Sequence, residues 1–321
     1  MLPSSRLNWL LGLLCLCAAS AAVAATPSSG RPAASEPITP IPPAPIQDPR
    51  RLALGEQLFN DTRLSHTNTR GCVACHDVRT NGASDAAHDP TPNGAPAPLN
   101  TPTVFNTALN FRLNWEGDLR TLEAQAEQSL HSPMTMATTP EEVLGRLRAD
   151  PAIVRQFRQA YGRGPDRADL LDALAAYERS LVTRGSRFDR WLAGDTAAIS
   201  SQEFRGYQFF KSLGCISCHQ GMNVGGNLYQ RHGIFHPLAA PRPEILRVPS
   251  LRNVAVTAPY FHDGSAATLP EAVRKMAYAQ LDLVLSDRQT ADIVAFLKTL
   301  TGQYRGHALT PAPTAPKAAA R

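Results

Sequence analysis

Two pentapeptides of the form Cys-x-x-Cys-His contain the most specific chemistry in this sequence. The residues concerned are Cys72, Cys75 and His76 in the first, and Cys215, Cys218 and His219 in the second. At this spacing the two thiols can add to the vinyl groups of one heme, and the adjacent histidine can bind its iron. Zinc binding or a redox dithiol is the alternative, but a four-ligand zinc site needs ligand pairs without a histidine in this register. The two motifs therefore predict two covalently attached hemes.

The first 25 residues have the pattern of a secretory signal peptide. An apolar run from Trp9 to Ala25 ends in Ala-Val-Ala-Ala, which is typical of a cleavage site. A membrane anchor is the alternative, although the run is short for a span of about 20 residues. Cys15 and Cys17 lie in this leader, so the other four of the six cysteines are the heme thiols and none remains for a disulfide. Because bacteria attach heme covalently outside the cytoplasmic membrane, we expect a periplasmic protein that meets the membrane only through its cleaved leader.

Composition divides the rest of the chain into two domains with unstructured ends. Residues 26–49 are rich in proline and alanine and are expected to form a disordered tether, and residues 310–321 a disordered tail. The length between them suits an N-terminal heme domain at 50–190 and a C-terminal heme domain at 191–309. The formal net charge is +5, but lysine and arginine are scattered, so the sequence does not indicate a nucleic-acid partner.

A weak internal repeat supports one domain per heme. Gly55 to Phe59 precedes the first heme motif and Gly206 to Phe210 precedes the second, and each reads Gly-x-x-apolar-Phe. Apolar residues at helical spacing predict a helix over 166–182, and Thr139 to Glu142 resembles a capping box that opens a helix through Arg148. The same capping pattern recurs at Ser200 with Glu203, at Thr268 with Glu271 and at Ser286 with Gln289. Strand signals are nearly absent. The predicted fold is mostly α, with two cytochrome c-like domains that each carry one covalent heme c.

The second ligand of each iron is less well defined by the sequence. In the C-terminal unit His219 is the proximal ligand, and Met276 lies on a short predicted helix at a distance suited to cover the far face of the heme, although methionine also fills cores. In the N-terminal unit His76 is proximal, and His88 lies in a polar loop, either as a solvated surface residue or as a displaceable ligand. The other candidates for the C-terminal iron are Met222, His232, His236 and His262.

Several longer strings resemble one known family, the bacterial diheme cytochrome c peroxidases, which also includes the diheme enzyme that matures methylamine dehydrogenase. The resemblance extends from Gly55 to Gly302, over almost the whole chain after the leader. The matching strings are Phe59 to Ser65, Asn100 to Asn106, Leu122 to Ala126, Ser186 to Asp189, Val248 to Asn253 and Thr257 to Ser265, the last being the most specific.

The resemblance implies a division of labour between the hemes. The N-terminal heme would be the low-potential peroxidatic site, with His76 as proximal ligand and His88 near the position of a displaceable distal histidine. The C-terminal heme would be the high-potential site of electron entry, bound by His219 and Met276, because methionine ligation raises the potential. A tyrosine in place of Met276 would resemble the methylamine-dehydrogenase-maturing branch instead.

The resemblance also assigns residues between and beside the two hemes. Trp115 matches the tryptophan between them, and Gln125 matches an active-site glutamine. Asn100, Thr257 and Pro259 match residues that hold a calcium ion at the domain junction through oxygen atoms, which suit a hard cation.

Two departures from the family pattern concern the site itself. Asp118 stands where the family has an arginine, which reverses a charge near Trp115. Thr135 stands where the family has a glutamate, and threonine cannot ionise to move a proton between the oxygens of peroxide. We expect Glu127 or His131 to be the residues that could take over this task.

These observations predict an oxidoreductase that reduces hydrogen peroxide to water with electrons from a small periplasmic donor, such as a cytochrome c or a cupredoxin. The alternatives are a peroxide-dependent oxidase that acts on a partner protein or peptide, and a non-catalytic diheme electron carrier or redox sensor. Thr135 favours both alternatives, whereas Met276 disfavours the oxidase. A homodimer is a possible assembly.

Overall fold

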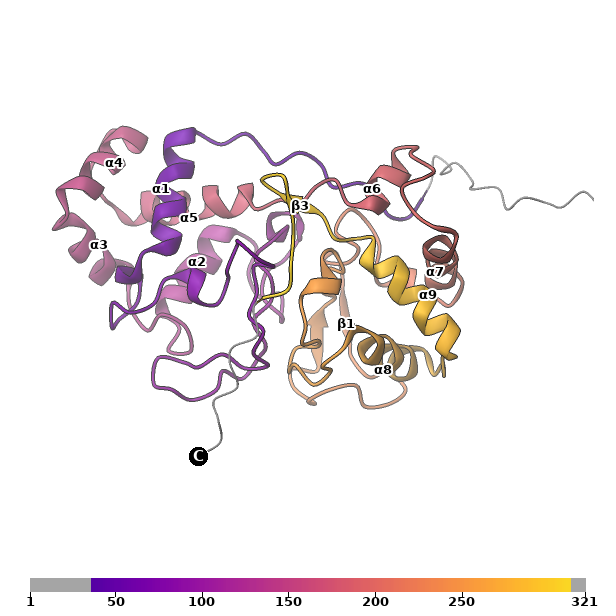
Figure 1. Cartoon of the computed structure of the whole chain (residues 1–321). Helices are drawn as coiled ribbons and strands as arrows, with labels where there is room; N and C mark the ends of the chain where they lie inside the picture. Colours follow the sequence, from indigo (N-terminus) through magenta and orange to yellow (C-terminus); the bar gives the residue numbers. More distant parts are fainter. Residues whose placement is uncertain (1–35, 313–321) are drawn as a thin grey trace, which may run out of the picture. The chain divides into compact units, whose positions relative to one another are not determined.

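The computed structural model describes residues 36–312, which form a helical protein (Figure 1). Its α-helices are α1 (Pro49–Asn60), α2 (Leu122–His131), α3 (Pro140–Arg148), α4 (Pro151–Tyr161), α5 (Arg167–Ser180), α6 (Arg187–Leu192), α7 (Ser201–Ser212), α8 (Leu269–Leu281) and α9 (Asp287–Lys298). Its antiparallel sheets pair β1 (Tyr229–Arg231) with β2 (Ile245–Arg247), and β3 (Gln303–Tyr304) with β4 (His307–Ala308). Short 3-10 turns lie at Thr62–Leu64, Cys72–Ala74, Thr107–Leu109, Cys215–Ser217 and Val254–Val256. The prediction of a mostly α fold is confirmed.

Helix caps account for most of the helix starts that the sequence predicts. Complete capping boxes open α7, between Ser200 and Glu203, and α9, between Ser286 and Gln289. At α3 the Thr139 hydroxyl accepts from the backbone N–H of Glu142, but the Glu142 carboxylate binds the hydroxyl of Thr138. The predicted box is therefore only half formed at α3.

The internal repeat of the sequence marks two equivalent helix crossings, α1 with α5 and α7 with α9. A Cβ atom on Gly55 would lie 1.9 Å from the carbonyl oxygen of Ala173, and one on Gly206 would lie 1.9 Å from that of Asp292. Only glycine permits so close an approach of two helix backbones. Each crossing brings the helix before a heme motif against the last helix of its unit.

Two hydrophobic cores surround these crossings. The first lies among α1 to α5 and includes Leu58 and Phe157, and the second lies among α6 to α9 and includes Phe296. Phe188 and Trp191 of α6 belong to the second core. The boundary between the cores therefore precedes α6, slightly before the boundary predicted at residue 190, because composition does not reveal which core a short connecting helix joins.

The segment before α1 packs against the C-terminal core. Ile38 is only 1 % exposed there, and the Glu36 carboxylate accepts hydrogen bonds from Tyr207 at 2.5 Å and from Lys211 at 3.1 Å. The guanidinium of Arg252 donates to the carbonyl oxygen of Thr39 at 2.9 Å. The prediction of a disordered tether over 26–49 is therefore wrong for residues 36–41, because residues distant in sequence bind the Glu36 carboxylate and the backbone carbonyls of Pro37 and Thr39.

The segment after α9 packs in the opposite direction, against the N-terminal core. Leu309 is part of that core, and Arg305 forms an ion pair with Glu56 of α1 at 2.7 Å. Residues 303–309 thus belong with the first core, although the sequence placed them in the C-terminal domain. A domain prediction that follows chain order cannot anticipate such a return.

The predicted leader with Cys15 and Cys17, the first ten residues of the predicted tether and residues 313–321 of the tail lie outside the described residues. Between residues 36 and 312, no helix is long and apolar enough to cross a membrane.

Candidate functional site

Both heme motifs border one cavity with a volume of about 910 Å³. All six motif residues line it, namely Cys72, Cys75, His76, Cys215, Cys218 and His219. Each Cys-x-x-Cys-His sequence forms a short 3-10 turn in which the backbone N–H of the histidine donates to the carbonyl of the first cysteine at 3.0 Å. This turn places both thiols and the imidazole of each motif at the wall of the cavity.

The two motif histidines have the environment of neutral ligands. The Nδ1 atom of His76 lies 3.1 Å from the carbonyl oxygen of Gly82, which favours the tautomer with a proton on Nδ1 and a free Nε2. Burial lowers the pKa of both histidines, that of His219 to about 4, although backbone carbonyls near each ring oppose the effect. An imidazole that remains neutral keeps a lone pair for a metal ion.

The motif cysteines do not have the properties of a redox dithiol. Burial raises the pKa of Cys72 to about 12 and the pKa values of Cys75 and Cys215 to about 11. A redox-active thiol requires a lowered pKa, because the thiolate is the reactive form. The environment therefore favours uncharged sulfur, which agrees with thioether bonds to a heme.

A buried cation at the cavity wall also fits a heme. Arg247 is 6 % exposed, and burial lowers its pKa to about 10. Its guanidinium donates to the carbonyl oxygen of Asn114 at 3.1 Å, and no carboxylate of residues 36–312 forms an ion pair with it. A propionate of a heme in the cavity would supply the missing negative charge.

The structure extends the internal repeat beyond what the sequence analysis recognised. Asn106 and Asn253 both adopt the left-handed backbone conformation, with φ of 62° and 63°, and both open a 3-10 turn. Thr121 and Thr268 follow at the same spacing and cap α2 and α8. Helix α2 is therefore the equivalent of α8, and the equal spacing of these residues in the sequence could have revealed it.

This equivalence places Ser129 where the other unit has Met276. Each lies eight residues after its capping threonine, and both line the cavity. A thioether binds heme iron readily, whereas a serine hydroxyl is not one of the usual protein ligands. On the α2 side, the Ser129 hydroxyl accepts a hydrogen bond from the amide of Gln125 at 2.9 Å. The sequence analysis identified Met276 but missed Ser129.

Thr135, which replaces the acid of the family pattern, and its two predicted substitutes, His131 and Glu127, have different surroundings. Thr135 lines the cavity, but its hydroxyl donates to the carbonyl oxygen of Ser129 at 2.5 Å. His131 also lines the cavity and is exposed, with Nδ1 2.9 Å from the carbonyl oxygen of Glu127. Glu127 does not line the cavity, and its carboxylate pairs with Arg167 of α5.

The histidine and methionine candidates for the second ligands are similarly divided. Met276, His232 and His262 line the cavity, whereas His88, His236 and Met222 do not. The imidazole of His236 instead lies 2.6 Å from the Asp282 carboxylate.

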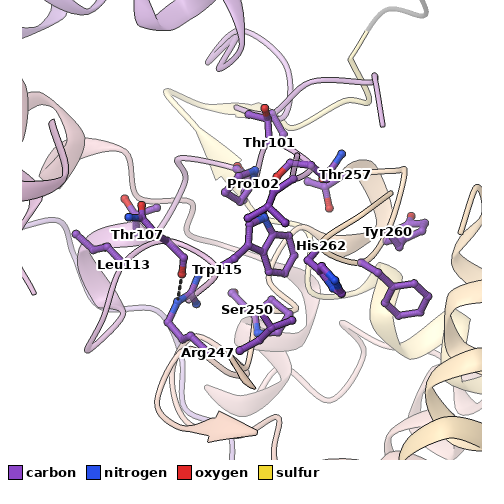
Figure 2. A pocket seen from close by; sticks show the side chains of 18 of the residues that line it. Thr101, Pro102, Thr107, Leu113, Trp115, Arg247, Ser250, Thr257, Tyr260 and His262 are labelled. Carbon is purple, nitrogen blue, oxygen red and sulfur yellow. Dashed lines mark hydrogen bonds between the residues drawn. The ribbon is translucent and has the colours of Figure 1, made fainter. Parts of the chain in front are cut away.

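Trp115 lines the cavity, and Figure 2 shows its indole beside Pro102 and His262. Its Nε1 donates to the carbonyl oxygen of Asn100 at 2.8 Å, and its own carbonyl accepts from the backbone N–H of Arg247 at 2.9 Å. The indole packs edge-on against His262, with ring centroids 6.3 Å apart. Asp118 near this tryptophan accepts hydrogen bonds from two side-chain amides, at 2.9 and 2.8 Å.

The three residues predicted to bind calcium, Asn100, Thr257 and Pro259, also line this cavity. The Asn100 amide nitrogen donates to the carbonyls of Ala86 and Ala87 at 3.0 and 3.3 Å. This orientation leaves its amide oxygen without a hydrogen-bond donor in the part of the chain that the structure describes, which fits a role as ligand of a hard cation.

Two family models match this chain. Residues 49–197 match the family described as di-haem cytochrome c peroxidase, and residues 204–301 match cytochrome c. Cytochrome c551 peroxidase of Nitrosomonas europaea is 37% identical over 290 residues, which cover 86% of this chain and 87% of that protein. The methylamine utilization protein MauG of Methylorubrum extorquens is 33% identical over 291 residues, which cover 82% of each.

Solved structures show the same fold. A MauG-like protein associated with microbial copper homeostasis is 27% identical, with a TM-score of 0.72 over 83% of this chain and 93% of that one. The diheme peroxidase BthA of Burkholderia thailandensis has a TM-score of 0.67 at 20% identity, over 83% of this chain and 91% of that one.

Proposed function

This chain belongs to the di-haem cytochrome c peroxidase family, and on that basis we propose that it reduces hydrogen peroxide to water at its N-terminal heme with electrons that enter through its C-terminal heme. The observation that carries this assignment is the pair Ser129 and Met276. Equivalent positions of the repeat offer a thioether to one iron and only a hydroxyl to the other. The N-terminal heme is thus the one at which peroxide can bind.

The two hemes c supply the redox chemistry, and the chain holds them through the six motif residues. Reduction of one hydrogen peroxide to two waters consumes two electrons and two protons. His76 and His219 line the cavity as the proposed proximal ligands, and Gln125, whose amide donates to the Ser129 hydroxyl, lines it from α2. The hydrogen bonds that fix Trp115 to Asn100 and Arg247 at the cavity support a role for this indole in electron transfer between the two hemes.

The proposal includes the setting in which the protein works. The predicted leader and the chemistry of covalent heme attachment support a periplasmic location and a small periplasmic electron donor, such as a cytochrome c or a cupredoxin. The free amide oxygen of Asn100, with Thr257 and Pro259 at the same cavity, supports a structural calcium ion.

The test places a methionine at position 129, so that the N-terminal iron is offered the same kind of second ligand as the C-terminal iron. Ser129→Met should convert the N-terminal heme to a six-coordinate, low-spin form and abolish its reaction with peroxide in stopped-flow mixing. Ser129→Ala is the matched control and should leave the spin state of the N-terminal heme unchanged, because it removes the hydroxyl without offering a ligand. An unchanged spin state and an unchanged peroxide reaction in Ser129→Met would show that this position does not face the iron.

A second candidate function, peroxide-dependent oxidation of a partner protein or peptide, is favoured by Thr135, which replaces the acid of the family pattern. Electron stoichiometry distinguishes the two. A peroxidase consumes two equivalents of reduced one-electron donor for each peroxide, whereas an oxidase that takes its electrons from a partner consumes none from such a donor.

A further inference from the structure

Glu178 is a buried carboxyl at the N-terminal heme site that the functions described above do not use. It lies near the end of α5, is 8 % exposed, and lines the cavity together with Leu174, one helical turn earlier. Gln125 and Ser129 line the same cavity from α2, which packs against α5. The carboxylate of Glu178 also contributes to the raised pKa of the Cys72 thiol, so Glu178 lies close to the first heme motif.

No cation neutralises this carboxyl. None of the ion pairs or side-chain hydrogen bonds within residues 36–312 involves it, and the neighbouring Arg179 is paired with Glu123 of α2. Burial raises the pKa of Glu178 to about 8; the Glu123 carboxylate adds to the increase and Arg179 opposes it. Near neutral pH the group therefore holds a proton that it can release.

The internal repeat shows that the fold does not require a carboxyl at this position. Gly55 approaches Ala173 and Tyr177, and Gly206 approaches Asp292 and Phe296 in the same manner. This match makes Leu297 of α9 the equivalent of Glu178. Leu297 is buried and lines the cavity as well. The unit with Met276 thus has an apolar side chain where the unit with Ser129 has an acid.

The other candidates for proton delivery are less well placed. Glu127 is paired with Arg167 and does not line the cavity, and His131 is exposed. The Thr135 hydroxyl donates a hydrogen bond to the carbonyl oxygen of Ser129. An acid is nevertheless useful at this site, because proton transfer to the departing oxygen assists cleavage of the O–O bond.

We propose that Glu178 is the proton donor for peroxide cleavage at the N-terminal heme, a role that rests on the proposed peroxidase function. Its carboxyl gives a proton to the outer oxygen of peroxide as the O–O bond breaks, and that oxygen leaves as water. The inner oxygen becomes the second water with one proton from solvent and two electrons from the donor protein. Solvent then returns a proton to Glu178, so that two protons and two electrons are consumed for each peroxide.

The experiment compares Glu178→Gln with Glu127→Gln, which removes a carboxylate of the same kind outside the cavity. Half-reduced protein is mixed with hydrogen peroxide in a stopped-flow instrument. We expect Glu178→Gln to react about 10²- to 10⁴-fold more slowly than the native protein, Glu178→Asp to recover part of the rate, and Glu127→Gln to react at the native rate. In the native protein the rate constant should fall as the pH rises through the pKa of Glu178, and in Glu178→Gln this dependence should be lost.

A second measurement does not depend on turnover. The midpoint potential of the N-terminal heme should decrease in the native protein as Glu178 loses its proton, because a nearby carboxylate stabilises the ferric state, and this decrease should be absent in Glu178→Gln. Glu178→Leu introduces the side chain that Leu297 has at the equivalent position, and it replaces Glu178→Gln in both measurements if the glutamine variant fails to bind two hemes. A native rate and native pH dependence in these variants would overturn the role of Glu178, whereas native protein that does not react with peroxide would overturn the peroxidase function instead.

Discussion

At the scale of single residues, the two units offer different side chains to the cavity at their equivalent positions Ser129 and Met276. The hydroxyl of Ser129 accepts a hydrogen bond from Gln125, whereas Met276 extends a flexible thioether toward the same cavity. Of these two groups, only the thioether is a usual ligand of heme iron, and it stabilises the ferrous state. In the function proposed above, this one side chain in each unit distinguishes the peroxide-binding heme from the electron-transfer heme.

This difference predicts the effect of Met276→His. A nitrogen ligand stabilises the ferric state more than a thioether does, so we expect the midpoint potential of the C-terminal heme to decrease substantially. Spectroelectrochemical titration of the fully loaded protein measures this change, and the N-terminal heme of the same sample serves as internal reference. The same potential and the same spectrum in the variant would mean that another residue, such as His232 or His262, binds this iron.

At the scale of secondary structure elements, the two glycine crossings hold the heme-bearing turns in place. Helix α1 leads into the first motif and α7 into the second, and each is locked against the last helix of its unit by a contact that excludes a methyl group. The aromatic pair Phe59 and Tyr177, with ring centroids 5.2 Å apart, adds to the first crossing.

We therefore expect Gly55→Ala to destabilise the protein. Its methyl group would meet the Ala173 carbonyl, and overpacking of this kind costs about 1–3 kcal/mol. Gly145→Ala in α3 is the control, because no atom lies within 4 Å of its added Cβ and alanine is favoured over glycine in a helix by up to ~1 kcal/mol. Urea denaturation of both variants measures the difference, and equal midpoints would contradict the tight crossing.

At the scale of the whole molecule, each end of the described chain packs on the core of the other unit. Residues 36–41 pack on the C-terminal core ahead of α1, and residues 303–309 return to the N-terminal core after α9. The buried ion pair of Arg252 with Asp189, at 2.8 Å, lies where the first of these segments docks, because the same guanidinium binds the carbonyl of Thr39. The site between the cores is thus held by contacts that are distant in sequence.

Arg252→Met should test this arrangement. It leaves the Asp189 carboxylate buried without its partner, and such a loss typically costs about 3–5 kcal/mol. We expect a lower urea midpoint and easier proteolysis within residues 36–48, with both hemes still covalently attached. Arg274→Met is the control, since its ion pair with Asp287 is exposed and contributes little. Equal stability of the two variants would exclude a structural role for the buried pair.

The sequence by itself determined the chemistry that depends on local order along the chain. Spacings of a few residues were enough to identify the two heme motifs, the helix starts at Ser200 and Ser286, and the glycine before each motif. Residues so close in sequence are positioned by local backbone geometry alone. Met276 could also be selected, because its helix begins with a recognisable cap.

The tertiary structure decided what depends on contacts between distant residues. It showed that Glu127 pairs with Arg167 instead of lining the cavity, that Glu178 lines the cavity without a paired cation, and that residues 36–41 are packed. The charge state of a buried carboxyl and the partner of a proline-rich segment are set by burial and by side chains from other elements. These neighbours come together only when the chain folds, so no spacing along the sequence could reveal them.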